Sequence, residues 1–208
     1  MPVITISSTY GAGGTPIAEA VAERLGWQLV SRAIPAQVAE RLAVPIERAL
    51  ARDDRLHTGL GRLLFARAAV FLAGAGAGTV GAERGDDDDF KVHTEEVIRS
   101  IADTSSAVVV GRGGAHILAG RPDALHVRLD GPMEARVRQA MAELGISEAE
   151  ARRALRETDR ARRLYVRHFY GPDWSNPTAY HLVLDSTAIP VEACTEVVLA
   201  AARGRLRV

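Results

Sequence analysis

Residues 9–26, TYGAGGTPIAEAVAERLG, combine the residue types that can hold a phosphate group. Three glycines in four positions let the backbone N–H groups turn toward an anion. A helix that begins directly after them adds a partial positive charge at its N-terminus. Thr15 offers a hydroxyl that can bind a magnesium ion. We therefore predict a phosphate cradle, and the alternative is a tight turn without a ligand. The predicted cradle comprises Gly11, Ala12, Gly13, Gly14 and Thr15.

The spacing of this loop matches part of the phosphate-binding pattern G-x-x-x-x-G-K-[ST]. Ser8 takes the place of the first glycine, and Gly14 stands where the pattern has its lysine. Gly13 and Thr15 keep the second glycine and the hydroxyl. The dinucleotide pattern G-x-G-x-x-G fits less well, because Pro16 falls at its third glycine. The loop thus predicts phosphate binding, and the charge of the missing lysine must come from elsewhere.

Arginines are the candidates for that charge, since nearly all of the 26 basic residues are arginines. Arg112 follows the apolar run VVVG, and the carboxyl ends of strands face the ligand in open parallel sheets. In the segment RRALRETDRARRLYVRHFYG, Arg160 and Arg163 share one helix face, while Arg162 points elsewhere. We predict that these four arginines contact the reacting phosphates. Ion pairs with neighbouring acids on a solvated face are the alternative for this segment.

The elements that must position these residues alternate between strands and helices. Short β-branched or apolar runs predict strands, and apolar residues at four-residue spacing predict helices. The alternation predicts an α/β fold with a parallel sheet and helices on both faces. The serine and acid of SEAE predict a capping box at the helix that follows Ser147. The expected strands are residues 3–7, WQLVS, AVVVGR, ALHVRLD and HLVLDST, and the later helices are residues 133–144, 147–169 and 191–203.

We expect one domain over residues 1–208, which is long enough for a full core. A helical insertion is expected at about residues 35–100, and its part from Pro35 to Ala73 could form a homodimer face. The arginine-rich segment is expected to form a lid at about residues 147–177. The four aspartates at residues 86–89 are expected to start a helix as a solvated charge run, and a magnesium site is the alternative.

The composition of the chain and the spacing of its residues argue against several classes of function. The formal net charge is zero, so no bulk attraction to nucleic acid or an anionic membrane is expected. Cys194 is the sole cysteine, lies in an apolar pattern and is expected to be a buried structural thiol. The histidines show no zinc-ligand spacing, and the aromatic residues are too scattered for a base-stacking platform. No secretion signal or membrane span is evident, so the expected location is cytoplasmic.

Several segments together resemble the cytidylate kinase-like family of P-loop proteins. The resemblance runs from Val3 to about Ala202, and its order and spacing are more specific than any single motif. The segments are ITISSTYGAGGTPIAEAVAERLG, DDDFKVHTEEVIRSIAD, AVVVGRGGAHIL, GISEAEARRALRETDRARRLYVRHFYG and WSNPTAYHLVLDST.

The resemblance implies a three-layer P-loop kinase fold with a five-stranded parallel sheet flanked by helices. It also implies transfer of the γ-phosphoryl group of ATP, with Mg2+, to a nucleoside monophosphate such as cytidylate or to another small acceptor. Residues 11–15 would hold the donor phosphates, and Arg112 would contact the acceptor phosphate. Asp159 and Arg162 in TDRAR resemble the Arg-Asp-x-x-Arg lid motif, so Arg162 would reach the phosphates. Asp185 is expected to be structural.

The chain departs from the family pattern at several positions. Gly14 replaces the lysine of bacterial cytidylate kinase, and Gly113 and Ser31 replace aspartates. Ser8 and Thr9 replace an arginine and a glutamate that looser relatives commonly carry. These departures define a second hypothesis, in which the chain is a catalytically impaired nucleotide-binding or sensor protein of the same fold.

Overall fold

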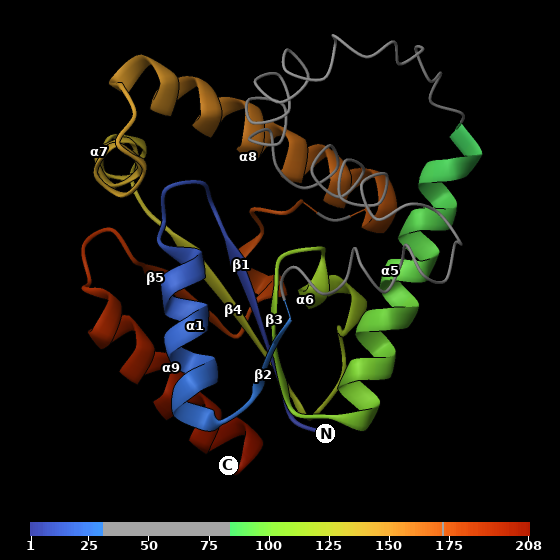
Figure 1. Ribbon diagram of the computed structural model, residues 1–208. Coiled ribbons are helices and arrows are strands. Elements are labelled where there is room, and N and C mark those ends of the chain that lie inside the picture. Colours follow the sequence, from blue (N-terminus) through green and yellow to red (C-terminus); the bar gives the residue numbers. More distant parts are fainter. Residues whose placement is uncertain (31–83, 172) are drawn as a thin grey trace, which may run out of the picture.

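The computed structural model describes residues 1–30, 84–171 and 173–208 of the chain. Five parallel strands form one sheet in the order β2-β3-β1-β4-β5, and helices pack on both of its faces (Figure 1). This arrangement confirms the predicted three-layer α/β fold, because a strand followed by a helix returns each new strand in parallel. The strands are β1 Val3–Ser8, β2 Gln28–Val30, β3 Ala107–Val110, β4 Ala124–Asp130 and β5 Leu182–Asp185.

Helices α1 and α9 cover one face of the sheet, and α5 with the short α6 covers the other (Figure 1). Helices α7 and α8 cross above the edge where the strands end. Ligands bind at this edge in open parallel sheets. The helices are α1 Gly14–Leu25, α5 Arg84–Thr104, α6 Gly114–Ile117, α7 Met133–Leu144, α8 Glu148–Tyr170 and α9 Val191–Leu206, with a 3-10 turn η1 at Pro177–Ala179.

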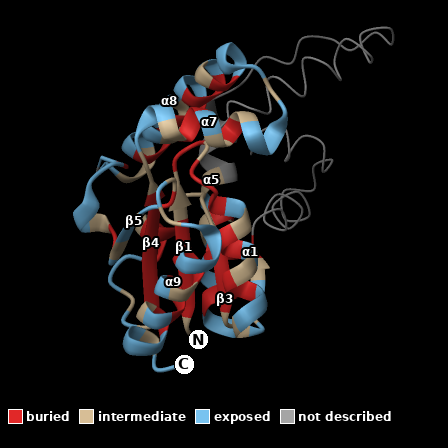
Figure 2. Cartoon of the chain, turned by 90° about the vertical axis from the view of Figure 1, so that its left-hand side faces the viewer, coloured by how far each residue is buried: buried red, intermediate tan, exposed pale blue. Residues whose placement is uncertain are grey.

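The hydrophobic core lies on both faces of the sheet, because alternate strand residues point to opposite sides. Ile4 of β1 packs in one cluster with Val198 of α9. Val3 packs in a second cluster with Ile98 of α5. Figure 2 shows the buried residues along the strands and on the inward sides of the helices. Burial on both faces explains why the central strands are continuous apolar runs in the sequence.

Local sequence signals agree with the observed helix ends. The Ser147 hydroxyl accepts a hydrogen bond from the Glu150 N–H, and the Glu150 carboxylate accepts one from the Ser147 N–H, which confirms the predicted capping box. Gly26 ends α1 with a left-handed backbone at φ 64°. Cys194 is fully buried in α9, as its apolar surroundings predicted. Among the described helices, none combines the length and apolarity needed to cross a bilayer.

Part of the predicted helical insertion falls outside the described residues. Ser31 and the segment from Pro35 to Ala73, with its predicted dimer face, lie within residues 31–83, which the structure does not describe. Helix α5 begins at Arg84 and therefore contains the four aspartates at residues 86–89 in its first turns. Helix α8 ends at Tyr170, one residue beyond the predicted end.

Candidate functional site

The glycine-rich loop lies at the carboxyl end of β1 and leads directly into α1. Gly13 precedes the helix with a left-handed backbone, at φ 62° and ψ 28°. Gly11 also has a positive φ of 76°, and a Cβ atom there would lie 2.3 Å from the backbone oxygen of Arg136 in α7. No side chain fits at this distance, so the close packing of the loop against α7 requires glycine. The structure thus shows a tight left-handed turn before α1, and phosphate binding by residues 11–15 stays a prediction.

Gly14 packs directly against the side chain of Ser8. A Cβ atom at Gly14 would lie 2.3 Å from the Ser8 Oγ and 2.6 Å from the Ser8 Cβ. A lysine at position 14 would therefore have to displace Ser8, which is the residue that replaces the first glycine of the loop pattern. The two departures from the pattern are linked by this contact.

A buried ion pair holds the start of the loop to the two helices above it. Asp159 of α8 accepts a hydrogen bond from the Tyr10 N–H at 2.9 Å and pairs with Arg136 of α7 at 2.6 Å. Arg136 also donates to the Tyr10 carbonyl at 3.2 Å. Asp159 and Arg136 are 6% and 8% exposed, so each buried charge requires the opposite charge of the other to be stable. The sequence associated Asp159 with the lid, and the structure shows that its carboxylate binds the loop backbone.

Two further hydroxyl contacts fix the loop against the sheet edge. The Thr9 hydroxyl donates to Asp130 at the end of β4 at 2.9 Å, and the Ser186 hydroxyl donates to the Ala12 carbonyl at 2.7 Å. Hydrogen bonds from Arg128, from the Gly131 N–H and from Thr9 lower the pKa of Asp130, although its burial acts in the opposite direction. Asp130 is therefore ionised at neutral pH and orients the loop.

Arg162 lies between two cavities at the edge of the sheet. One cavity of about 200 Å³ is lined by Arg112, and we call it the Arg112 cavity. The other, of about 210 Å³, is lined by residues 8–16, and we call it the loop cavity. Arg162 and Thr15 line both cavities. Arg162 donates a hydrogen bond to the Ser8 carbonyl, and burial lowers its pKa while the nearby Asp159 opposes that shift.

The other predicted arginines differ in position. Arg112 lines the Arg112 cavity, as expected for the end of β3. Arg160 and Arg163 are exposed on α8, and neither lines one of the two cavities. The structure thus brings Arg112 and Arg162 together with the loop, and the roles of Arg160 and Arg163 stay predictions.

Arg112 stands in the turn Gly111–Gly114, which we call the Arg112 turn, and the first three residues of this turn are left-handed. Its φ is 52°, between Gly111 at 72° and Gly113 at 69°. A residue with a side chain in this conformation costs about 1–2 kcal/mol. A Cβ atom at Gly113 would lie 2.6 Å from the Tyr170 ring of α8. Such strain is often kept at functional sites, where it directs a side chain toward a ligand.

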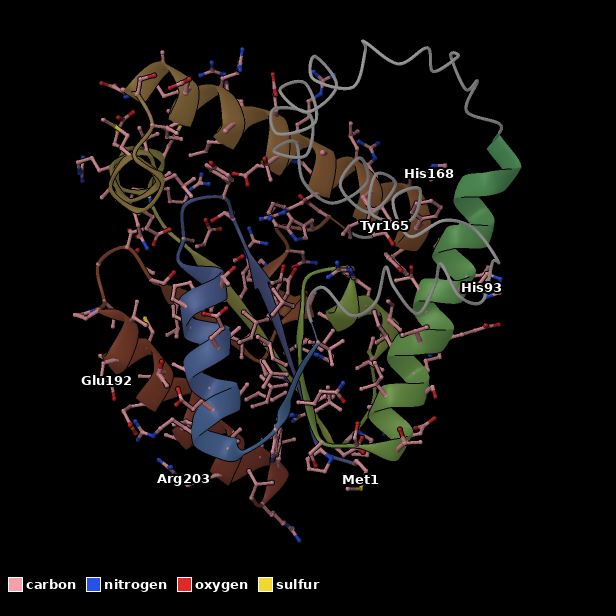
Figure 3. All side chains as sticks on the ribbon, in the orientation of Figure 1. Met1, His93, Tyr165, His168, Glu192 and Arg203 are labelled. Carbon is pink, nitrogen blue, oxygen red and sulfur yellow. The ribbon has the colours of Figure 1, made fainter. Side chains whose placement is uncertain are left out.

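Aromatic residues that the sequence did not single out form much of the Arg112 cavity. Tyr165 lies beneath α8 in Figure 3, toward the sheet edge, and lines the cavity together with Trp174 and His116. Trp174 donates its Nε1 hydrogen to Ser7 at 3.0 Å, and the Arg128 guanidinium stacks on its ring at 4.4 Å. Burial lowers the pKa of His116. His116 lies two residues after GRGG in the sequence, and this closeness to Arg112 is the signal that could have identified it.

The five-stranded parallel sheet flanked by helices is the fold of P-loop kinases. Solved structures share the fold: an uncharacterized protein from Eubacterium ventriosum ATCC 27560 is 18% identical, with a TM-score of 0.68, and covers 99% of this chain and 100% of its own. A gluconokinase from Sinorhizobium meliloti 1021 has 13% identity and a TM-score of 0.52 over 99% of this chain and 94% of its own. A shikimate kinase from Bacteroides thetaiotaomicron has 14% identity and a TM-score of 0.50 over 100% and 99%.

The family is shown by the sequence itself. The model of the cytidylate kinase-like family matches residues 3–188, which is most of the chain. The protein therefore belongs to the cytidylate kinase-like family, as the motifs predicted. No curated protein matches the chain at a significant level.

Proposed function

We propose that this protein transfers the γ-phosphoryl group of ATP, bound with Mg2+, to a nucleotide or another small acceptor. The observation that carries the proposal is the position of Arg162, which lines both cavities and contacts the end of β1. In this proposal the donor phosphates occupy the loop cavity and the acceptor occupies the Arg112 cavity. Phosphoryl transfer depends mainly on positioning and on neutralising charge, both of which this arrangement can provide.

The loop supplies backbone N–H groups and the N-terminus of α1 for the donor phosphates. A bound Mg2+ ion would neutralise charge on the triphosphate, and the Thr15 hydroxyl, at the first turn of α1, is the residue proposed to hold it. Arg162 would take over the role of the absent loop lysine, because its guanidinium reaches the same region from α8. Five N–H donors in a planar fork allow it to contact two phosphate oxygens at once.

The described lining of the Arg112 cavity suits an anionic acceptor. It includes Arg112, Arg162 and His116, and no aspartate or glutamate belongs to the part of the lining that the structure describes. Two guanidinium groups favour a phosphate or carboxylate on the acceptor, and Arg112 is proposed to hold it. Trp174 and Tyr165 add flat apolar surface beside that anion.

The test is a phosphoryl transfer assay with Mg-ATP over the common nucleoside monophosphates. Arg162→Met should lower kcat by about 10³-fold, because a charge that stabilises the transferring group is lost. Arg156→Met, which removes an exposed arginine from the same helix, is the matched control and should change kcat little. Absence of turnover with every acceptor, together with absence of ATP binding by calorimetry, would overturn the proposal.

A second candidate is a nucleotide-binding sensor without turnover, and the contact between Gly14 and Ser8 favours it. A lysine at position 14 would have to displace Ser8, so the contact supports a loop that works without the lysine. The sensor hypothesis predicts ATP binding without phosphoryl transfer, and Gly13→Asp should abolish that binding by placing a carboxylate at the cradle.

The double variant Gly14→Lys with Ser8→Gly separates the two candidates. It removes the steric conflict and restores the lysine and first glycine of the loop pattern. In a kinase that uses Arg162, turnover should fall, because the new lysine competes with Arg162 for the same oxygens. A gain of turnover from an inactive parent would instead identify the missing lysine as the defect and favour the sensor hypothesis.

A further inference from the structure

A serine near the end of β1 lies at the wall of the Arg112 cavity. Ser7 lines this cavity and is half-buried. Alternate strand residues point to opposite faces of a sheet, so Ser7 lies on the same face as Thr5, which also lines the cavity. The Thr5 hydroxyl is buried and lies 2.8 Å from the His126 Nδ1, so it is already hydrogen-bonded. Ser7 is therefore the hydroxyl on this face of β1 that a ligand can use.

The indole group of Trp174 determines which part of the Ser7 hydroxyl is available. An indole N–H can only donate, so the Ser7 Oγ accepts the hydrogen of the Trp174 Nε1 at 3.0 Å. The Tyr180 hydroxyl donates to the Trp174 carbonyl at 3.0 Å and lies 3.5 Å from the Ser7 Oγ, too far for a strong bond between hydroxyls. Within the described residues, Ser7 thus accepts one strong hydrogen bond and has no close acceptor for its own hydrogen.

Buried contacts hold Trp174 in the position that orients this hydroxyl. Trp174 is 5% exposed, and the Arg128 guanidinium donates to its carbonyl at 2.9 Å and stacks on its ring at 4.4 Å. Arg128 is itself buried and pairs with Asp130 at 2.8 Å, which compensates its charge. The Trp174 N–H therefore has a fixed direction, and it occupies the same side of the Ser7 oxygen in every molecule.

The charged groups of the cavity indicate what the Ser7 hydrogen would meet. Arg112 and Arg162 line the same cavity, and its described lining contains no aspartate or glutamate. The Gly111 N–H donates to the Ile6 carbonyl at 2.9 Å, which places the Arg112 turn directly beside the end of β1. Guanidinium groups attract anionic oxygens, and such oxygens accept hydrogen bonds. The available half of the Ser7 hydroxyl, a donor, matches the ligand that the two arginines attract.

We propose that Ser7 binds the acceptor by donating its hydroxyl hydrogen to an anionic oxygen, and that Trp174 is the positioning residue that orients this hydroxyl. The inference rests on the proposed function, since it places the acceptor in the Arg112 cavity. A serine on a central strand has a short side chain on a fixed backbone, whereas the two arginines have long side chains. Ser7 thus sets the position of the anion relative to Ser8 and the phosphate loop, which follow it directly.

The first experiment measures phosphate binding by the full chain while the loop cavity is occupied. Inorganic phosphate is the probe for the acceptor anion, and the non-hydrolysable ATP analogue AMP-PNP with Mg2+ keeps it out of the phosphate loop. Equilibrium dialysis gives the Kd of phosphate, and calorimetry gives the Kd of AMP-PNP. Ser7→Ala should weaken phosphate binding by about tenfold, because a hydrogen bond to a charged group is lost. It should leave the Kd of AMP-PNP unchanged, since Ser7 does not belong to the described lining of the loop cavity.

Ser175→Ala is the matched control for this variant. Ser175 is exposed, follows Trp174 directly and belongs to the described lining of neither cavity, so its loss should change neither Kd.

The outcomes separate this inference from the proposed function. If both ligands bind and Ser7→Ala leaves the Kd of phosphate unchanged, the inference is wrong and the proposed function stands. If AMP-PNP binds to the parent protein but phosphate does not bind beside it, the acceptor site of the proposed function is wrong, and the inference with it. If Ser7→Ala weakens AMP-PNP as much as phosphate, Ser7 supports the structure of the whole site, which also overturns the inference.

A double-mutant cycle tests the role of Trp174. Trp174→Phe keeps an aromatic ring but removes the N–H, so it should weaken phosphate binding by about threefold, because the Ser7 hydroxyl loses its orienting partner. In the Ser7→Ala background the same change should have no further effect, because no hydroxyl is left to orient. Trp27→Phe changes the other tryptophan of the chain, which lies outside the described lining of the cavity, and should have no effect in either background. Additive losses for Ser7→Ala and Trp174→Phe would show that Trp174 acts independently of Ser7 and would overturn its positioning role.

Discussion

The phosphate loop and the Arg112 turn are built on the same plan but carry different chemistry. Each follows a strand, passes through a left-handed glycine and enters a helix: Gly13 at φ 62° before α1, and Gly113 at φ 69° before α6. The strands β1 and β3 are neighbours, and the Gly111 N–H donates to the Ile6 carbonyl at 2.9 Å. The first turn carries three glycines and no cation, whereas the second carries Arg112 in a strained conformation.

The comparison shows that the left-handed backbone of the phosphate loop and the arginines near it come from different elements of the fold. The phosphate loop has the left-handed glycines, and in the proposed function its positive charge would come from Arg162 of another helix, which donates a hydrogen bond to the Ser8 carbonyl. The same helix, α8, contacts both turns: Asp159 holds Tyr10 in the first, and Tyr170 packs on Gly113 in the second. Helix α8 therefore connects the two halves of the site, through an ion pair at one end and ring packing at the other.

The largest effect is expected from Gly11→Ala, which breaks the geometry of the first turn. The φ of 76° and the 2.3 Å approach to the Arg136 oxygen both exclude a Cβ. We expect the free energy of unfolding to fall by more than about 3 kcal/mol, because left-handed strain adds to an overpacking cost. Urea denaturation measures it.

Gly26→Ala is the control, since it has φ 64° but no atom within 4 Å of its Cβ position. The free energy of unfolding of Gly26→Ala should fall only by the left-handed strain of about 1–2 kcal/mol. Equal losses for the two variants would show that the contact with α7 has no energetic importance.

The two contacts of α8 should differ in strength. Asp159→Asn leaves the buried Arg136 charge without its partner and should cost about 3 kcal/mol in unfolding free energy. Tyr170→Phe removes a hydroxyl that lies near Tyr165 and Glu95 but no charge, and should cost only about 1 kcal/mol. Denaturation with matched urea slopes measures both. A larger loss for Tyr170→Phe than for Asp159→Asn would reverse the comparison between the two ends.

Acid should lower the free energy of unfolding through a contact between β4 and β1, the strand that leads into the phosphate loop. His126 of β4 binds Thr5 of β1 through its Nδ1 at 2.8 Å, and burial, then His181, lowers its pKa to about 4. Its ordinary pKa is about 6.5, so between pH 6.5 and 4 the unfolded chain binds the proton that the folded chain excludes. The contribution of neutral His126 to the free energy of unfolding is thus complete above pH 6.5 and is lost as the pH falls toward 4.

The expected loss between pH 6.5 and 5 is about 2 kcal/mol from this histidine. His126→Gln removes the titrating group and should flatten the dependence of unfolding free energy on pH by that amount. Denaturation series for both proteins over this range measure the difference. Identical slopes for the two would mean that His126 binds its proton as readily in the folded chain as in the unfolded chain.

The fold and much of the site could be predicted because their signals are local. The apolar run AVVVG marks β3, and the glycines with Thr15 mark a strand-to-helix turn. The family resemblance related Arg162 to the phosphates through TDRAR. Each of these signals occupies a few consecutive residues, where periodicity and turn chemistry determine the structure.

The contacts that could not be predicted join residues distant in the sequence. Asp159 reaches Tyr10 across 149 positions, and the conflict between Gly14 and Ser8 appears only in three dimensions. Arg160 and Arg163 were grouped with Arg162 because spacing gives the relative faces of a helix but not which face meets the loop. Helix spacing did not separate Arg162 from these two, whereas the tertiary packing turns Arg162 toward the loop and leaves Arg160 and Arg163 exposed.

The smallest expected change tests why the Arg112 turn keeps a strained arginine where the phosphate loop has Ala12. Asparagine tolerates the left-handed conformation better than most residues, so Arg112→Asn should raise the free energy of unfolding by about 0.5–1 kcal/mol. It should also weaken acceptor binding, measured as a rise in KM, because a guanidinium that lines the cavity is lost. Arg112→Ala keeps the strain and loses the charge, so it should weaken the acceptor without the gain in stability. If both variants are as stable as the parent and KM is unchanged, the strain at Arg112 is not connected to the acceptor, and the two turns differ in sequence but not in function.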